Sequence, residues 1–340
     1  MRYSIIVPVY NRPDEVDELL ESLTKQTLKD FEVIIVEDGS IKPCKDVCEK
    51  YANILDLHYY AKENSGPGQS RNYGAERSNG EWLIILDSDV VLPEGYLEAV
   101  EKSLASSTSI EAWGGPDTAH PSFTPVQKAI SYSMTSFFTT GGIRGGKKKL
   151  DKFFPRSFNM GIRRDVYQQL GGFSKMRFGE DVDFSYRIVE AGYQPQLFPE
   201  AWVWHKRRTD FRKFFRQVYN SGIARINLEK RHPGTMKLVH LLPMVFTLGV
   251  LGMLLLSVLS LLSPLTSHLS PLFLLPLLLY CLLLLIDSTI LNKSLKVGLL
   301  SIPAAFTQLM GYGFGFIESW WKRCVLKQDE FTAFEKNFYK

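Results

Sequence analysis

Two aspartates one residue apart, Asp87 and Asp89, have the spacing in this chain that most clearly indicates chemistry. They follow directly on the apolar run 82–86, which is typical of a buried parallel strand. Ligands of open α/β sheets bind at the carboxyl ends of such strands. The pair suits a hard divalent cation, because such cations take oxygen ligands and bridge to phosphate oxygens. Taken alone, the pair could also be a solvated acidic turn.

Two further groups could take part in catalysis or metal binding. Glu180 and Asp181 are adjacent acids at the predicted start of a helix, and His205 follows a predicted strand at 201–204. Each has an ordinary alternative. Acids are common at helix starts because the helix dipole favours them there, and a histidine at a strand end is often a plain polar residue.

Alternating strands and helices are predicted to position these residues. From residue 1 to about 115 the chain alternates short apolar strands with helical patterns, which is typical of βαβ units on a parallel sheet. The predicted strands are 3–9, 31–36, 56–60 and 82–86. Residues 116–205 are less regular and include a glycine- and lysine-rich stretch at 141–149, either a loop that closes over phosphates or a surface turn.

The last third of the chain is predicted to enter a membrane. Three apolar segments, 239–262, 271–291 and 296–318, each approach the ~20 residues needed to cross a bilayer. The first two are predicted to form a helical hairpin. Lysines lie after the second segment and cations follow the third, and both groups favour the cytoplasmic side. Three full crossings cannot satisfy both, so either the third segment is re-entrant or interfacial, or the tail departs from the charge rule.

Charge and termini favour a cytoplasmic membrane surface over nucleic acid as partner. The chain has a net charge of +4, and its basic residues crowd into 206–237, directly before the apolar segments. Such a position indicates contact with anionic lipid headgroups. The first residues are predicted to enter a strand at once, without the long apolar core that a secretory signal has. The four cysteines show no metal-ligand spacing. We expect a multi-pass protein of the cell membrane with its soluble part in the cytoplasm.

Five ordered motifs carry a resemblance to a known family. They are Ile6-Val7-Pro8-Val9-Tyr10-Asn11, Val36-Glu37-Asp38-Gly39-Ser40, Gly66-Pro67-Gly68 with Arg71-Asn72-Tyr73-Gly74, Asp87-Ser88-Asp89 and Gly179-Glu180-Asp181. The chain resembles the family 2 glycosyltransferases of the GT-A fold. The resemblance implies a Rossmann-like α/β domain with a mostly parallel central sheet, here followed by an all-α transmembrane region. It also implies inverting, metal-dependent transfer from a nucleoside diphosphate sugar.

The resemblance also assigns roles to individual residues. Asp89 and His205 would bind a divalent ion, Mn²⁺ or Mg²⁺, and Asp87 would bind the ion, its water or the ribose. Asp181 would be the catalytic base, with Glu180 orienting the acceptor. The residues implied in binding the nucleotide sugar are Pro8, Tyr10, Asp38, Gly68, Arg71, Asp87 and Ser88. Asp38 would accept a hydrogen bond from a uracil-like ring, which favours a UDP-sugar, and Arg71 would meet the pyrophosphate.

Two departures from the family pattern limit which residues and which type of transfer we expect. Glu37 stands where members usually carry an aspartate, so only Asp38 of that pair is assigned. Polymerising members carry Gln-x-x-Arg-Trp after the acidic dyad, whereas residues 217–221 lack the Arg-Trp pair. We therefore expect transfer of a single sugar. The basic stretch and the apolar hairpin directly after the catalytic part favour a lipid-linked acceptor, in glycan or polysaccharide biosynthesis.

The expected domains are a catalytic domain at 1–232, a membrane region at 238–321 with two or three helices, and a basic tail at 322–340. Within the first, 1–115 would bind the nucleotide, 116–205 the acceptor, and 206–232 the membrane surface. One alternative is a polyprenyl-phosphate monosaccharide synthase. Another is a catalytically silent sugar-nucleotide-binding protein. A dinucleotide-binding module is disfavoured, because the turn at 10–13 lacks the required glycines.

Overall fold

The computed structural model describes residues 1–106, 109–120, 122–140, 153–206, 208–262 and 267–330. These residues divide into two compact units. Unit 1 comprises residues 1–120 and 151–206, and unit 2 comprises residues 121–150 and 207–330, each as far as it is described. The glycine- and lysine-rich stretch at 141–149 and the end of the predicted tail lie outside the described residues.

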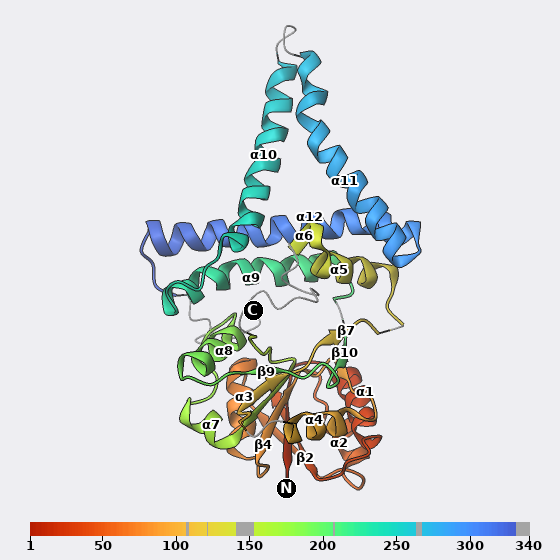
Figure 1. The fold of residues 1–340 in the computed structure, drawn as a ribbon, viewed down its shortest axis with the longest axis vertical. Helices are drawn as coiled ribbons and strands as arrows, with labels where there is room; N and C mark the ends of the chain where they lie inside the picture. The colour runs from red at the N-terminus through yellow and green to blue at the C-terminus, as the bar shows by residue number, and fades with distance from the viewer. Residues whose placement is uncertain (107–108, 121, 141–152, 207, 263–266, 331–340) are drawn as a thin grey trace. The chain divides into compact units, whose positions relative to one another are not determined.

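A seven-stranded sheet forms the centre of unit 1 (Figure 1). Its order is β3 (Leu57–Lys62), β2 (Phe31–Asp38), β1 (Tyr3–Val9), β4 (Trp82–Leu86), β8 (Asn159–Arg163), β6 (Ala112–Gly114) and β9 (Gln196–Leu197). Strands β1 to β4 pair in parallel, and β8 runs antiparallel to β4 and β6. The mostly parallel α/β sheet predicted from the strand and helix pattern is confirmed.

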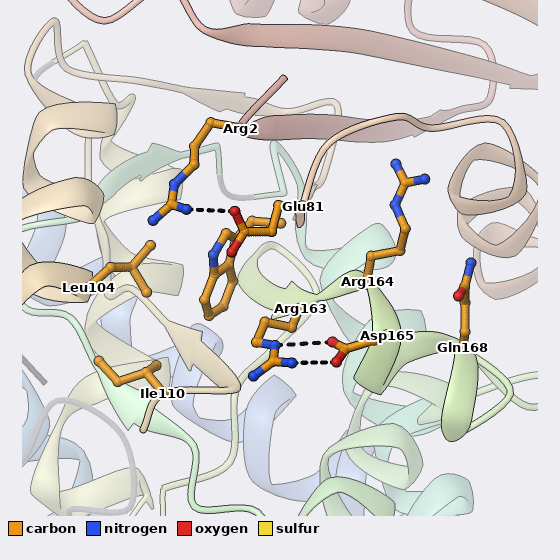
Figure 2. A pocket seen from close by; sticks show the side chains of 9 residues that line it. Arg2, Glu81, Leu104, Ile110, Arg163, Arg164, Asp165 and Gln168 are labelled. Atoms are coloured by element: carbon orange, nitrogen blue, oxygen red, sulfur yellow. Dashed lines mark hydrogen bonds and ion pairs between the residues drawn. The ribbon is translucent and has the colours of Figure 1, made fainter. Parts of the chain in front are cut away.

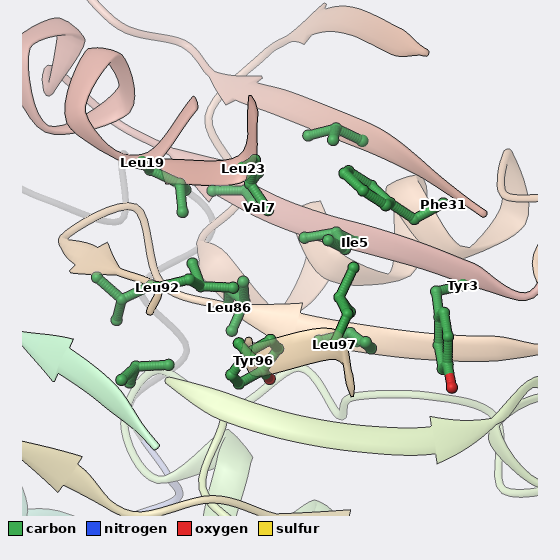
Figure 3. Close-up of a cluster of buried hydrophobic side chains, with 14 of the residues drawn as sticks. Tyr3, Ile5, Val7, Leu19, Leu23, Phe31, Leu86, Leu92, Tyr96 and Leu97 are labelled. Carbon is green, nitrogen blue, oxygen red and sulfur yellow. The ribbon is translucent and has the colours of Figure 1, made fainter. Parts of the chain in front are cut away.

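Helices cover both faces of this sheet. They are α1 (Pro13–Thr24), α2 (Lys45–Tyr51), α3 (Pro67–Glu76), α4 (Tyr96–Ala105), α7 (Arg164–Gln169) and α8 (Glu180–Glu190). Because successive side chains of a strand point to opposite faces, Ile5 and Val7 of β1 pack with Leu19 of α1, as Figure 3 shows. Ile6 packs on the other face with Phe184 of α8. The two cores therefore fix α1 and α8 on opposite sides of the same strand.

The loops after β1 and β2 are tied together at the carboxyl edge of the sheet. Asn11 adopts a left-handed backbone conformation with φ of 55°, which asparagine tolerates better than most residues. Its side-chain oxygen accepts hydrogen bonds from the backbone N–H groups of Ile41, at 2.7 Å, and Lys42, at 2.9 Å. This edge is the one at which the predicted site residues of the first two strands gather.

A smaller sheet completes unit 1. It consists of β5 (Val90–Val91), β10 (Val203–His205) and β7 (Asp117–Thr118), with β10 in the middle. Strand β5 begins directly after Asp89. His205 therefore lies within a strand and not beyond its end, and this pairing, which the sequence pattern does not predict, decides where its imidazole lies.

Unit 2 is helical. It contains α5 (Pro125–Thr135), α6 (Phe137–Thr140), α9 (Phe211–Arg231), α10 (Leu242–Leu261), α11 (Ser270–Asn292) and α12 (Leu295–Trp320), with short helical turns η1 (Leu238–Leu241), η2 (Ser267–Leu269) and η3 (Trp321–Val325). Three segments, Leu238–Leu261, Ser267–Asn292 and Leu295–Val325, are long and apolar enough to cross a membrane. The predicted apolar helices are therefore present at the expected places.

Helix α12 runs across the base of the hairpin formed by α10 and α11, and it packs along α9 (Figure 1). Glycines allow this close contact. A Cβ atom on Gly315 would lie 2.0 Å from the backbone oxygen of Tyr219, and one on Gly222 would lie 2.2 Å from that of Tyr312. Both interpretations of 296–318, an interfacial helix and a third crossing, stay predictions. Helices α5 and α9 belong to this unit, whereas the sequence pattern grouped them with the catalytic domain; those domain boundaries stay a prediction.

Candidate functional site

Asp87, Asp89 and His205 form one cluster at the carboxyl edge of the large sheet. One ligand atom from each lies within 4.8 Å of the others, and Nε2 of His205 is 3.2 Å from Oδ1 of Asp89. The turn between β4 and β5 carries both aspartates. Antiparallel pairing of β10 with β5 places His205 opposite Val90, next to Asp89. The structure thus brings together all three residues that were predicted to bind a metal ion.

A third carboxylate holds the other side of the imidazole. Oδ2 of Asp117 in β7 lies 3.5 Å from Nδ1 of His205. Burial lowers the pKa of His205, but the carboxylates of Asp89 and Asp117 outweigh it and raise that pKa to about 9. Asp117 was not predicted, because an isolated aspartate in an irregular segment has no pattern that marks it.

The donor set of this cluster fits a divalent cation. Two carboxylates supply the hard oxygen ligands that Mg²⁺ and Mn²⁺ prefer, and an imidazole is acceptable to Mn²⁺. Arg12, which follows β1, also contacts the cluster through a hydrogen bond from Nη1 to Oδ2 of Asp89. Arg12 was not predicted, although its position directly after the first motif, beside Asn11, was a usable signal. The metal-binding roles themselves stay a prediction.

A buried arginine connects the cluster to the acidic dyad. The side chain of Arg71, on α3, is only 4% exposed. Its Nη2 donates a hydrogen bond to Asp87 at 2.8 Å, and its Nη1 donates one to Glu180 at 3.0 Å. The predicted contact of Arg71 with a pyrophosphate stays a prediction, since Nη1 and Nη2 of Arg71 both donate to carboxylates. The guanidinium of Arg71 thus lies between Asp87 and Glu180, which come from distant parts of the chain.

The dyad begins α8, directly after Gly179, whose left-handed φ of 86° turns the chain into the helix. Burial raises the pKa of Glu180 to about 7, although Arg71 opposes the shift. Burial also acts to raise the pKa of Asp181, but the charge of Arg156 outweighs it and leaves that pKa below its usual value. Nε of Arg156 donates to Oδ2 of Asp181 at 2.6 Å. The two acids of the dyad thus pair with different arginines.

Asp38, the residue predicted to recognise the base, is held by four donors. Its Oδ1 accepts from Lys62 and from the backbone N–H of Ser65, at 2.9 Å. Its Oδ2 accepts from the backbone N–H of Gly66, at 2.8 Å, and from Asn64, at 3.2 Å. A carboxylate offers about four acceptor positions, so binding a base would require one donor to leave. The base-binding role of Asp38 stays a prediction.

The other predicted nucleotide-binding residues lie along the same edge or beside the dyad. Pro8 lies in β1 and Tyr10 directly follows it, while Ser88 is buried between the two aspartates. Gly68 has a different environment, because a Cβ atom there would lie 3.1 Å from Cγ of Glu180. Its lack of a side chain makes room for the dyad. Their contacts with a nucleotide sugar stay a prediction.

Glu37, the departure from the family pattern, has a structural role. It is buried, and its carboxylate accepts hydrogen bonds from the hydroxyl of Ser40 and, at 2.7 Å, from the backbone N–H of Cys44. The longer side chain reaches the start of α2 and fixes the loop after β2. This contact explains why a glutamate is accommodated beside Asp38.

A cavity of about 480 Å³ in unit 1 lies away from these residues (Figure 2). It is lined by Arg2, Glu81, Trp82, Leu104, Ile110, Arg163, Arg164, Asp165 and Gln168. Arg2 pairs with Glu81 at 2.6 Å, and Arg163 pairs with Asp165 across the cavity wall. The lining includes the amino-terminal ends of β1 and β4, so this cavity lies at the opposite edge of the sheet from the acidic cluster.

Comparisons with known proteins indicate the family of the chain. Residues 4–171 match the model for glycosyl transferase family 2. An uncharacterized glycosyltransferase of Haemophilus influenzae is 32% identical over 202 residues, which cover 58% of this chain and 64% of that protein. The glycosyltransferase AglE of Haloferax volcanii is 25% identical over 253 residues, 73% of this chain and 81% of that protein. This chain thus spans under two thirds of the length of the Haemophilus relative.

A solved structure shows the same fold. The mannosyltransferase PcManGT of Pyrobaculum calidifontis, solved with GDP-Man and Mn²⁺, superposes with a TM-score of 0.57 at 16% identity, over 95% of this chain and 88% of that one. At this identity the likeness concerns the fold alone. The chain therefore carries a family 2 glycosyltransferase domain of the GT-A fold, followed by helices suited to anchor it in a membrane.

Proposed function

We propose that this protein is an inverting, metal-dependent glycosyltransferase of the cell membrane. It moves one sugar, of the hexose type, from a nucleoside diphosphate sugar, with a UDP-sugar favoured, to a lipid-linked saccharide at the cytoplasmic surface. The observation that carries the proposal is the double contact of Arg71 with Asp87 and Glu180. This contact puts the candidate cation cluster and the acidic dyad on either side of one guanidinium, an arrangement in which both groups would act on one sugar.

On the donor side, Asp87, Asp89 and His205 would hold the cation. An ion bound there would stabilise the charge that develops on the departing diphosphate. The Pyrobaculum enzyme, which was solved with Mn²⁺ and GDP-Man and has the same fold, supports this assignment. Other parts of the chain would orient these ligands: the turn between β4 and β5 carries the two aspartates, and Asp117 contacts His205.

On the acceptor side, Asp181 would take the proton of the attacking hydroxyl. Direct displacement with inversion requires a base on the face opposite the leaving group. The ion pair with Arg156 keeps Asp181 ionised, and hence able to accept a proton, at neutral pH. Glu180 lies next to Asp181 and accepts a hydrogen bond from Arg71. Glu180 would therefore orient the acceptor relative to the donor site.

A lipid-linked acceptor is supported by the character of unit 2. Helix α9 exposes Arg212, Lys213, Phe215 and Arg216 in its first half, a combination suited to anionic headgroups and the apolar layer beneath them. Three apolar segments belong to the same unit. An acceptor that is itself held in the bilayer would therefore lie in the same membrane that anchors the protein.

Donor hydrolysis tests the proposal most simply. Purified protein with Mn²⁺ should consume one donor in a panel of UDP- and GDP-sugars, and EDTA should abolish the reaction because the diphosphate loses its stabilising charge. Asp89→Asn should lower both Mn²⁺ affinity and turnover, the latter by about 100-fold or more. Asp165→Asn, which changes an exposed aspartate, is the matched control. Consumption of no donor, or EDTA-resistant consumption, would contradict the proposal; binding without turnover would indicate a silent sugar-nucleotide-binding protein.

Asp181→Asn should separate the proposal from its nearest rival. If Asp181 is the base, transfer should fall by about 100-fold to about 10,000-fold, while donor binding stays within the error of the wild-type value. A polyprenyl-phosphate monosaccharide synthase uses a phosphate nucleophile that is already ionised and needs no base. Survival of transfer in this variant, measured with a labelled donor, would therefore favour the synthase.

The pH dependence of transfer should report on Glu180. Because its raised pKa is about 7, Glu180 gains a proton as the pH falls through that value, and Arg71 then loses one of its two carboxylate partners. We expect kcat/KM of the wild type to decline below about pH 7. Glu180→Gln cannot titrate, so it should be slower throughout but lack this decline. A decline of equal shape in both proteins would show that another group titrates.

A further inference from the structure

Arg156 places a partly open guanidinium beside the candidate base. Its Nε donates to Asp181 at 2.6 Å, and its side chain is 41% exposed. In the part of the chain that the structure describes, its two Nη groups donate no hydrogen bond. The side chain is thus fixed by Asp181 at Nε and is partly exposed to solvent.

The position of Arg156 is held by contacts with α8, the helix that carries the dyad. The hydroxyl of Ser185 donates to the backbone oxygen of Pro155, and the ring of Phe154 packs edge-to-face on Tyr186 with centroids 5.0 Å apart. The backbone N–H of Asn159 donates to the backbone oxygen of Arg156 at 3.1 Å. These contacts fix the segment before β8 against α8, so the guanidinium stays next to Asp181.

The two arginines near the dyad serve different sides of the site. Arg71 is buried and reaches toward the cation cluster through Asp87, whereas Arg156 pairs with Asp181 and with neither Asp87 nor Asp89. A guanidinium fork binds phosphate oxygens with two parallel hydrogen bonds. An anion on Arg156 would therefore lie beside the base, on the acceptor side, and not at the cation cluster that would receive the donor diphosphate.

We propose that Arg156 binds the phosphate of the lipid-linked acceptor and thereby positions the acceptor hydroxyl at Asp181. This inference rests on the proposed function and narrows its substrate class. Because the phosphate would sit next to the carboxylate that takes the proton, the attacking hydroxyl belongs to the sugar attached directly to the lipid phosphate. The acceptor is then a lipid phosphate or diphosphate that carries a single sugar, and Arg156 is a positioning residue.

Binding of farnesyl diphosphate to the purified full chain tests this proposal, with farnesol as the uncharged probe. The wild type should bind farnesyl diphosphate more tightly than farnesol. Arg156→Gln should weaken binding of farnesyl diphosphate by about tenfold or more, as expected for lost charge-assisted hydrogen bonds. Arg156→Lys, which keeps the charge but not the fork, should weaken it less. Binding of UDP with Mn²⁺ should stay unchanged in both variants.

Arg163→Gln is the matched control, because Arg163 also pairs with an aspartate, Asp165, but lies at the far end of β8. It should bind farnesyl diphosphate like the wild type. Equal binding by wild type and both Arg156 variants, or equal binding of farnesol and farnesyl diphosphate by the wild type, would overturn the proposal. Loss of UDP binding instead would assign Arg156 to the donor and also overturn it.

If Arg156→Gln does not fold, as judged by circular dichroism, the lysine variant carries the test, and unchanged binding there would contradict a bidentate phosphate contact. Failure of the proposed function appears separately, as absence of donor consumption by the wild type. In transfer assays Arg156→Lys should raise KM for the lipid acceptor and leave KM for the donor unchanged, which a merely structural role would not produce.

Discussion

The buried guanidinium of Arg71 is the constraint on which the rest of the site depends. A charge out of contact with water is tolerated only when it is paired, so Arg71 requires both Asp87 and Glu180. These partners come from the end of β4 and the start of α8, which are far apart in the chain. Gly68 leaves room for Glu180 beside α3, and Gly179 turns the chain so that the dyad begins its helix there. The folding of unit 1 thus brings the candidate donor and acceptor sides together around the guanidinium of Arg71.

Two adjacent acids acquire different proton affinities from their surroundings. Glu180 is buried and shares Arg71 with Asp87, and its pKa rises to about 7. Asp181 is paired with Arg156, which no other acid of the site shares, and its pKa is lowered. When the environments of two carboxyl groups separate their pKa values, the two groups commonly take different acid and base roles. Here the division gives Asp181 the ionised state that a base requires, while Glu180 responds to pH near neutrality.

The parts of the fold that follow from local pattern could be predicted from the sequence. Strands β1, β2 and β4 and the acidic residues at the ends of β2 and β4 were predicted because apolar runs and their boundaries are local signals. The family resemblance implied roles for Asp87, Asp89 and His205, but only the pairing of β10 with β5 explains why the histidine reaches the aspartates. Asp117 and Arg156 were missed, since single charged residues in irregular segments have no period. Arg12, directly after the first motif, was missed although its position was a usable signal. The crosswise course of α12 depends on glycine contacts with α9, which hydropathy alone does not reveal.

The central claim is that the cation cluster and the dyad form one electrostatic unit through Arg71. The affinity of the protein for Mn²⁺, measured in Glu180→Gln without any substrate, tests it directly. Removing the carboxylate of Glu180 leaves Arg71 balanced by Asp87 alone, so Mn²⁺ should bind several-fold more weakly, although Glu180 is not among the predicted ligands. Asp183→Asn, in the same helix but paired with Arg187, should leave the affinity unchanged. Unchanged Mn²⁺ affinity in Glu180→Gln would contradict the account.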